Sequence, residues 1–113
     1  MSRNVKLYLD DILTCIERTG DYVGDLSFEE LSENQMVVDA VVRNLEVIGE
    51  ASKHIPDDLR SKYSYDWRSV AGLRDILIHE YFGVSLKILW DIVQNELPGL
   101  EVRIRDIIEQ EDL

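Results

Sequence analysis

Cysteine and histidine, the residues of disulfides and of most zinc sites, are scarce in this chain of 113 residues, which contains one cysteine and two histidines. Cys15 has no partner within the chain, so an intrachain disulfide is excluded. The cysteine lies in an apolar helical pattern, which predicts a buried, unreactive thiol in a reducing compartment. The two histidines and the cysteine show no metal-ligand spacing, so we expect neither a metal site nor a cofactor.

Long hydrophobic runs are also missing. No apolar stretch approaches the ~20 residues that a membrane-spanning helix requires. The start of the chain, MSRNVKLYLDDILTCIERTG, is interrupted by charges every few positions and does not resemble a signal peptide. We therefore expect a cytoplasmic protein that makes no contact with a membrane.

Positive charge is in short supply, with 12 lysines and arginines against 23 acidic residues and a net charge of -11. This balance argues against non-specific binding to a nucleic-acid duplex. The excess acid is concentrated at the two ends, because residues 43–87 carry equal numbers of acidic and basic side chains. A local site for an anion remains possible in that balanced segment.

The alternation that is typical of strands is absent, whereas apolar residues recur at three- and four-residue spacings along most of the chain. This periodicity predicts helices over residues 3–19, 33–54 and 67–81, and a fourth helix that starts after Ser85. The sequence LPG at 97–99 should kink or break the fourth helix. No repeat or linker divides the chain. We expect one domain over residues 1–113, an all-α, four-helix up-and-down bundle with a kinked last helix.

Several residues mark the expected helix ends. Gly20 should close the first helix and Gly83 the third. Pro56 should begin a short helical turn in the link that follows the second helix. The expected N-caps and capping boxes are Ser27 with Glu30, Ser32 with Gln35, Asp66 and Ser85.

The segment GLRDILIHEYF, residues 72–82, places an arginine, a histidine and a tyrosine among apolar residues. On a helical wheel Arg74 lies within about 40° of the apolar face that contains Trp67 and Val70. Because a charge in a core must be matched, one interpretation is a buried, structural ion pair with Glu46 or Glu50 of the second helix. Tyr81 has the same angular position and can be interpreted as an aromatic residue at the core edge.

His79 lies about 140° around the helix from Arg74, so the two do not share one face of an ideal helix. They can share a site if the helix unwinds near Gly83, or if a second copy of the chain completes a groove. Apolar residues on nearly every side of this helix predict a homodimer through the third and fourth helices, and Gly72 would allow a close approach. A hydrogen-bonded interface role for His79 stays open. His54 ends the second helix, where it can interact with the helix dipole.

A metal-free site that contains one histidine and one arginine suits phosphoryl transfer within RNA. The ribose 2′-hydroxyl supplies the nucleophile, histidine moves the proton, and arginine neutralises the charge that develops on the phosphate. A dimer could supply one histidine as the base and another as the acid.

The blocks WRSVAGLRDILIHEYFGVS and ILWDIVQNELPGL resemble the HepT-like branch of the HEPN superfamily, and AVVRNLEVIGEASKHIP is similar to its second-helix signature. Together they cover about residues 40–100. The resemblance implies a homodimeric, metal-independent ribonuclease toxin of a type VII toxin–antitoxin pair, with RNA as its substrate. It implies that Arg74 and His79 are the catalytic pair and that Asp75 supports them.

The same resemblance implies a partner, a minimal nucleotidyltransferase antitoxin of the MntA type. This partner would silence the toxin by transferring AMP to Tyr81. The added negative phosphate, two residues from His79, would repel the RNA backbone. The alternative is a non-catalytic helical partner of a nucleotidyltransferase, in which Arg74 and His79 serve nucleotide binding or the dimer.

Overall fold

The computed structural model describes residues 4–79 and 85–113, with side chains over 4–74 and 85–113. The described residues are helical apart from short connections and contain no strand, so the prediction of an all-α protein is confirmed. Within the described residues, no helix combines the length and the apolar character needed to cross a membrane.

The first helix, α1, covers Val5–Val23 and extends beyond the expected range. Its N-cap is Asn4, whose side chain accepts a hydrogen bond from the backbone N–H of Lys6. The expected end at Gly20 is wrong, because the helix continues through this residue to Gly24. Gly24 has a φ of 50°, which glycine adopts at little cost, and its N–H donates to the carbonyl of Gly20.

The connector after α1 contains a short helix, α2, at Phe28–Ser32. The capping box of Ser27 and Glu30 is confirmed, because the Ser27 hydroxyl accepts from the N–H of Glu30 and the Glu30 carboxylate from the N–H of Ser27. The second expected box, Ser32 with Gln35, is wrong. Ser32 ends α2 and donates to the carbonyl of Phe28, and the side chain of Asn34 caps the next helix instead.

The long helix that follows, α3, covers Gln35–Ser52, slightly less than the predicted 33–54. Pro56 then precedes the short helix α4, Asp57–Lys62, as expected. The next long helix, α5, covers Trp67–His79. Asp66 accepts a hydrogen bond from the N–H of Ser69 at 3.2 Å, as an N-cap does. The expected end of α5 near residue 81 and the role of Gly83 fall outside the described residues.

The last helical stretch comprises α6 (Leu86–Asp91), a five-residue π-helix η2 (Ile92–Glu96) and α7 (Leu97–Gln110). Ser85 is the N-cap of α6, but its side chain makes no capping hydrogen bond. The sequence predicts a kink or break of the helix at 97–99. The departure from α-helical geometry lies just before that segment, in the π-helix η2. Pro98 lacks an N–H and its ring crowds the carbonyl four residues earlier, which a wider turn relieves.

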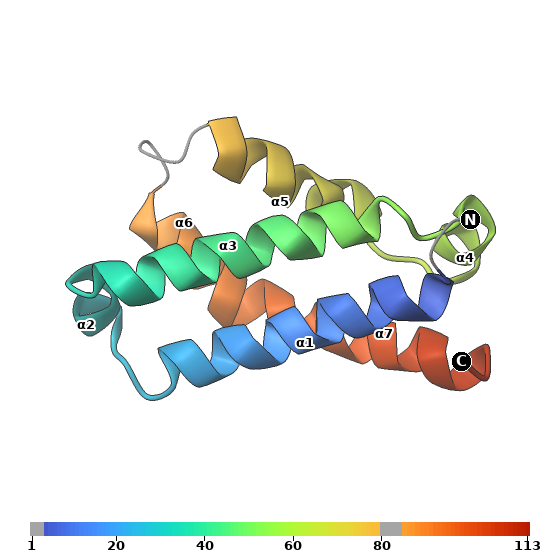
Figure 1. Ribbon diagram of the computed structural model, residues 1–113, viewed down its shortest axis with the longest axis horizontal. Helices are drawn as coiled ribbons and strands as arrows, with labels where there is room; N and C mark the ends of the chain where they lie inside the picture. The colour runs from blue at the N-terminus through green and yellow to red at the C-terminus, as the bar shows by residue number, and fades with distance from the viewer. Residues whose placement is uncertain (1–3, 80–84) are drawn as a thin grey trace.

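The long helices surround one apolar core. Successive long segments run in alternating directions, α3 lies between α1 and α5, and α7 packs on α1 (Figure 1). The most deeply buried side chains on α1, α3 and α7 are Leu9, Ile12, Val41, Leu45, Ile48, Leu100, Ile104 and Ile107. Cys15 is buried among them as predicted, and burial raises the pKa of its thiol.

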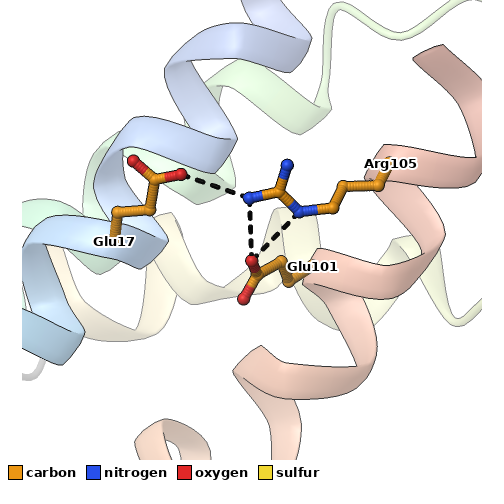
Figure 2. A network of polar contacts seen from close by, with 3 residues as sticks. All are labelled: Glu17, Glu101 and Arg105. Carbon is orange, nitrogen blue, oxygen red and sulfur yellow. Dashed lines mark hydrogen bonds and ion pairs between the residues drawn. The ribbon is translucent and has the colours of Figure 1, made fainter. Parts of the chain in front are cut away.

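Polar contacts at the surface connect helices that are distant in the sequence. Arg105 on α7 contacts Glu17 on α1 at 3.2 Å and Glu101 one turn away at 3.0 Å (Figure 2). At the end of the chain, Glu111 accepts hydrogen bonds from Lys62 at 2.6 Å and Tyr63 at 2.7 Å. These contacts fix α7 to α1 and to the end of α4.

Candidate functional site

Arg74 lies on α5 where that helix crosses α3 most closely. The crossing point on α3 is Gly49, which is buried. A Cβ atom at this position would lie 2.6 Å from the backbone nitrogen of Arg74 and 3.2 Å from the carbonyl oxygen of Val70. The missing side chain at Gly49 therefore allows the backbone of α5 to contact α3 directly. This contact fixes the position of the Arg74 backbone relative to α3.

The guanidinium of Arg74 is paired with a carboxylate of α3. Its Nε lies 2.7 Å from Oε2 of Glu50, one of the two partners expected for a structural ion pair. The expectation that the pair is buried is wrong, because the side chains of Arg74 and Glu50 are 40% and 50% exposed. Trp67 and Val70 occupy the buried face of α5 as predicted, and Arg74 lies at its edge.

This exposure weakens the structural interpretation of Arg74. An exposed ion pair contributes only ~0.2–1 kcal/mol to the free energy of unfolding, because water screens both charges. A buried pair would be costly to break, by ~3–5 kcal/mol. The Arg74–Glu50 pair by itself therefore contributes little to the stability of the fold.

A cavity of about 400 Å³ opens beside Arg74 between α1, α3 and α5. It is large enough for a small charged group and is walled mainly by polar side chains. Besides Arg74, the polar residues that line it are Tyr8, Asp11, Arg43, Glu46, Glu50 and His54.

Aromatic and charged side chains form a continuous series across this cavity. The rings of Tyr8 and His54 are stacked, with centroids 4.4 Å apart and planes within 7°. Nε2 of His54 lies 3.8 Å from Oε1 of Glu50, whose other oxygen contacts Arg74. Glu50 thus lies between the guanidinium of Arg74 and the imidazole of His54.

Sequence reasoning missed His54 and Tyr8 as members of this group. The spacing of Glu50 and His54, one helical turn apart, was a signal that the two side chains could meet. The position of Tyr8 had no such local signal, since it reaches His54 only because α1 packs on α3.

The other predicted site residues are not tested by the described side chains. His79 is the last described residue of α5, and its side chain and that of Asp75 lie outside the described part. Tyr81 lies outside the described residues altogether. The structure therefore brings Arg74 together with Glu50, His54 and Tyr8, and the predicted Arg74–His79 pair stays a prediction. Among the described residues, no three histidine, cysteine or acidic side chains are grouped so that they could hold a metal ion.

A family model and several individual relatives match most of this chain, and their names refer to ribonucleases. The family described as "HepT-like: Ribonuclease HepT-like" matches residues 12–107. A protein of Caldanaerobacter subterraneus subsp. tengcongensis, named provisionally as an RNase, is 42% identical over 105 residues, which are 92% of this chain and 94% of its own. A protein of Thermococcus cleftensis named "Probable ribonuclease HepT" is 41% identical over 102 residues, or 89% and 93% of the two chains.

A third relative is longer than this chain. It is a Methanocaldococcus jannaschii protein whose name combines gamma-glutamylcyclotransferase with a provisional RNase, and it is 40% identical over 113 residues. The match covers 99% of this chain and 51% of the relative, so the chain spans about half the length of that protein. No solved structure matches the chain.

Proposed function

Because this chain belongs to the ribonuclease HepT-like family, we propose that it is an endoribonuclease that needs no metal ion and uses Arg74 and His79 as its catalytic pair. The observation that supports this most directly is the partly exposed side chain of Arg74 on the wall of a cavity. Its ion pair with Glu50 is exposed to water, where an incoming phosphate can compete with it, and the family match covers its position.

The proposed reaction is a phosphoryl transfer within RNA. The 2′-oxygen attacks the adjacent phosphorus as the imidazole of His79 accepts the 2′-hydroxyl proton. The bond from phosphorus to the 5′-oxygen breaks, and the leaving oxygen takes a proton from a second imidazole, that of another copy of the chain, or from water. The products are a 2′,3′-cyclic phosphate and a 5′-hydroxyl end.

Arg74 binds the phosphate whose charge increases during this transfer. Glu50 holds the guanidinium through Nε in the absence of RNA. Since this contact is worth ~0.2–1 kcal/mol, an incoming phosphate can displace it or share the guanidinium with it. A guanidinium presents five N–H donors in a rigid plane, which suits it to bind a carboxylate on one edge and a phosphate on another.

The decisive experiment is RNA cleavage by purified protein in the presence of a chelator. We expect His79→Ala and Arg74→Ala each to lower the cleavage rate by ~10²–10⁴-fold. Arg105→Ala is the matched control, because Arg105 is also a half-exposed, ion-paired arginine but lies on α7 away from the cavity. Equal rates for the wild-type protein and His79→Ala would refute the nuclease and favour the non-catalytic partner of a nucleotidyltransferase.

The proposal extends to control by a second protein. In a type VII toxin–antitoxin pair, a nucleotidyltransferase of the MntA type would transfer AMP from ATP to the hydroxyl oxygen of Tyr81. The new oxygen–phosphorus bond forms as the α–β phosphoanhydride bond of ATP breaks, pyrophosphate leaves, and the hydroxyl proton passes to solvent. Intact mass measured after co-expression with that partner should increase by the mass of one or more AMP groups. Tyr81→Phe should abolish the increase and restore cleavage. A Tyr81→Phe protein that still gains AMP would show that another residue is the acceptor.

A further inference from the structure

The cavity beside Arg74 continues along the surface between α1 and α3. A second cavity of about 490 Å³ lies farther along the same two helices and shares Asp11, Arg43 and Val47 with the first. Arg18 and Tyr22 on α1 line its far part. We call the two cavities together the α1–α3 groove.

Two arginines in this groove have, within the described part of the chain, either a distant acidic partner or none. The side chain of Arg43 is 74% exposed. It forms a long ion pair with Glu46, in which its Nη1 lies 3.9 Å from Oε2 of the carboxylate. Arg18 is exposed and forms no ion pair with any described residue. In a chain with 23 acidic side chains and a net charge of -11, such arginines are available to bind an external anion.

We propose that the α1–α3 groove is a path for single-stranded RNA that leads to Arg74, in which Arg43 and Arg18 each bind a phosphate away from the cleaved bond. The inference rests on the proposed ribonuclease function and adds binding positions to it. Arg18 is ten residues from Tyr8 on α1, a distance of about 15 Å along the helix. Because Tyr8 lines the cavity beside Arg74, we expect that a ligand must extend along α1 to contact both Arg74 and Arg18.

The groove suits a single strand better than a duplex. Its far end offers Tyr22, which is 42% exposed and can stack on an unpaired base. Asp11 and Glu46 also line the path, so it is not uniformly basic and would bind weakly. A duplex would bring many more phosphates against a strongly acidic molecule, whereas a single strand can follow the few arginines.

The test measures RNA binding by a variant in which the proposed catalytic histidine has been replaced, so that the RNA is not cleaved during the measurement. A fluorescent uridine decamer is titrated with the otherwise full-length His79→Ala protein at several salt concentrations. We expect Arg18→Ala and Arg43→Ala, each added to His79→Ala, to weaken binding by roughly two- to fivefold. Each should also reduce the slope of log K against log salt by ~0.7, the value for one phosphate contact on a single strand. Arg18→Lys, which keeps the charge, should retain the slope.

Two controls make the result specific. Arg68 on α5 is exposed and also forms no ion pair with any described residue, but it lines a different cavity, so Arg68→Ala should leave binding unchanged. Binding of a uridine dinucleotide should be insensitive to Arg18→Ala, because so short a ligand cannot reach from Arg74 to Arg18. Circular dichroism should confirm that each variant is folded.

Several outcomes would overturn the path. One is a salt dependence of binding that is unchanged in Arg18→Ala and Arg43→Ala. Another is an equal loss of binding affinity in Arg68→Ala, and a third is failure of the His79→Ala protein to bind the decamer. If the wild-type protein cleaves RNA while both groove variants bind normally, the path is wrong and the nuclease stands. If the variants weaken binding but the wild-type protein cleaves nothing, the nuclease is wrong and the groove still binds RNA.

Discussion

At the scale of single residues, the exposure of the Arg74–Glu50 contact allows a structural role of Arg74 to be distinguished from a catalytic role. The two side chains are about half exposed, so water already screens their attraction. A catalytic arginine can be removed at a large cost in rate and a small cost in stability, whereas an arginine of a buried ion pair cannot.

We therefore predict that Arg74→Ala lowers the free energy of unfolding by less than ~1 kcal/mol. Urea unfolding followed by circular dichroism measures this change, with Arg105→Ala as the control for loss of an exposed, paired arginine. A loss of ~3–5 kcal/mol would instead identify Arg74 as a member of a buried ion pair that stabilises the fold.

The residues of the candidate site were only partly predictable from the sequence. The GLRDILIHEYF segment directed attention to Arg74, and the need to match its charge suggested Glu50 among two candidates. The exposure of the pair could not be predicted, since a helical wheel gives an angle but not the depth of the neighbouring helices. The stacking of Tyr8 on His54 depends on how α1 is placed against α3, which no local pattern encodes.

At the scale of helices, the crossing of α3 and α5 at Gly49 positions Arg74. We predict that Gly49→Ala lowers the free energy of unfolding by ~1–3 kcal/mol, because the new methyl group would overlap the backbone of α5. Cleavage should decrease as well, since α5 must shift away from α3 together with Arg74. Chemical denaturation and the RNA cleavage assay measure the two effects.

Gly20→Ala provides the matched control for this substitution. Gly20 is also within a helix, but a Cβ there would have no described atom within 4 Å beyond the helix's own backbone. The change should stabilise the protein by ~0.5–1 kcal/mol, because alanine favours the helix more than glycine does. If Gly49→Ala behaved like Gly20→Ala, the close crossing would not be what positions α5.

The helices themselves were largely predictable from apolar periodicity, and their ends less so. The pattern located the long helices, and local chemistry identified the caps at Ser27 and Asp66. Gly20 was a misleading stop signal because a glycine ends a helix only where the chain adopts a positive φ, and here Gly24 does so. The position of the π-helix before Pro98 depends on how the backbone relieves the clash with proline, which the sequence does not specify.

At the scale of the whole molecule, the end of the chain is fixed to α4 through Glu111. Hydrogen bonds from Lys62 and then Tyr63 lower the pKa of this carboxyl below its ordinary value of 4.5. A carboxyl with a lowered pKa in the folded state stabilises the protein above its ordinary pKa, and the stabilisation is lost as the pH falls through the folded-state pKa.

We predict that Glu111→Gln destabilises the protein at neutral pH and that the difference from the wild type shrinks well below pH 4.5. Urea unfolding at a series of pH values measures this difference. Glu109→Gln is the control, because Glu109 is an exposed carboxylate at the end of α7, two residues before Glu111, and has no partner among the described residues. A difference that is constant with pH, or equal for both variants, would contradict the proposed contact.

The homodimer remains a prediction that a substitution can test. Among the described residues, no atom outside the helix's own backbone would lie within 4 Å of a Cβ on Gly72, so this part of the surface has room for a partner. We predict that Gly72→Arg yields folded monomers in light scattering, whereas Gly20→Arg, at an equally open position on α1, leaves the dimer intact. A wild-type protein that is monomeric at every concentration would remove the dimer from the proposal.

The π-helix before Pro98 has a consequence for every residue after it. The wider turn acts like one residue inserted into the last helix, which advances the phase of α7 by about 100° relative to an uninterrupted helix. In this phase Leu100, Ile104 and Ile107 are buried, and α7 packs on α1. Deleting one residue from 92–96 would restore the ordinary turn and rotate that apolar stripe toward water, so the spacing of this short segment matters more to the core than the identity of its exposed side chains.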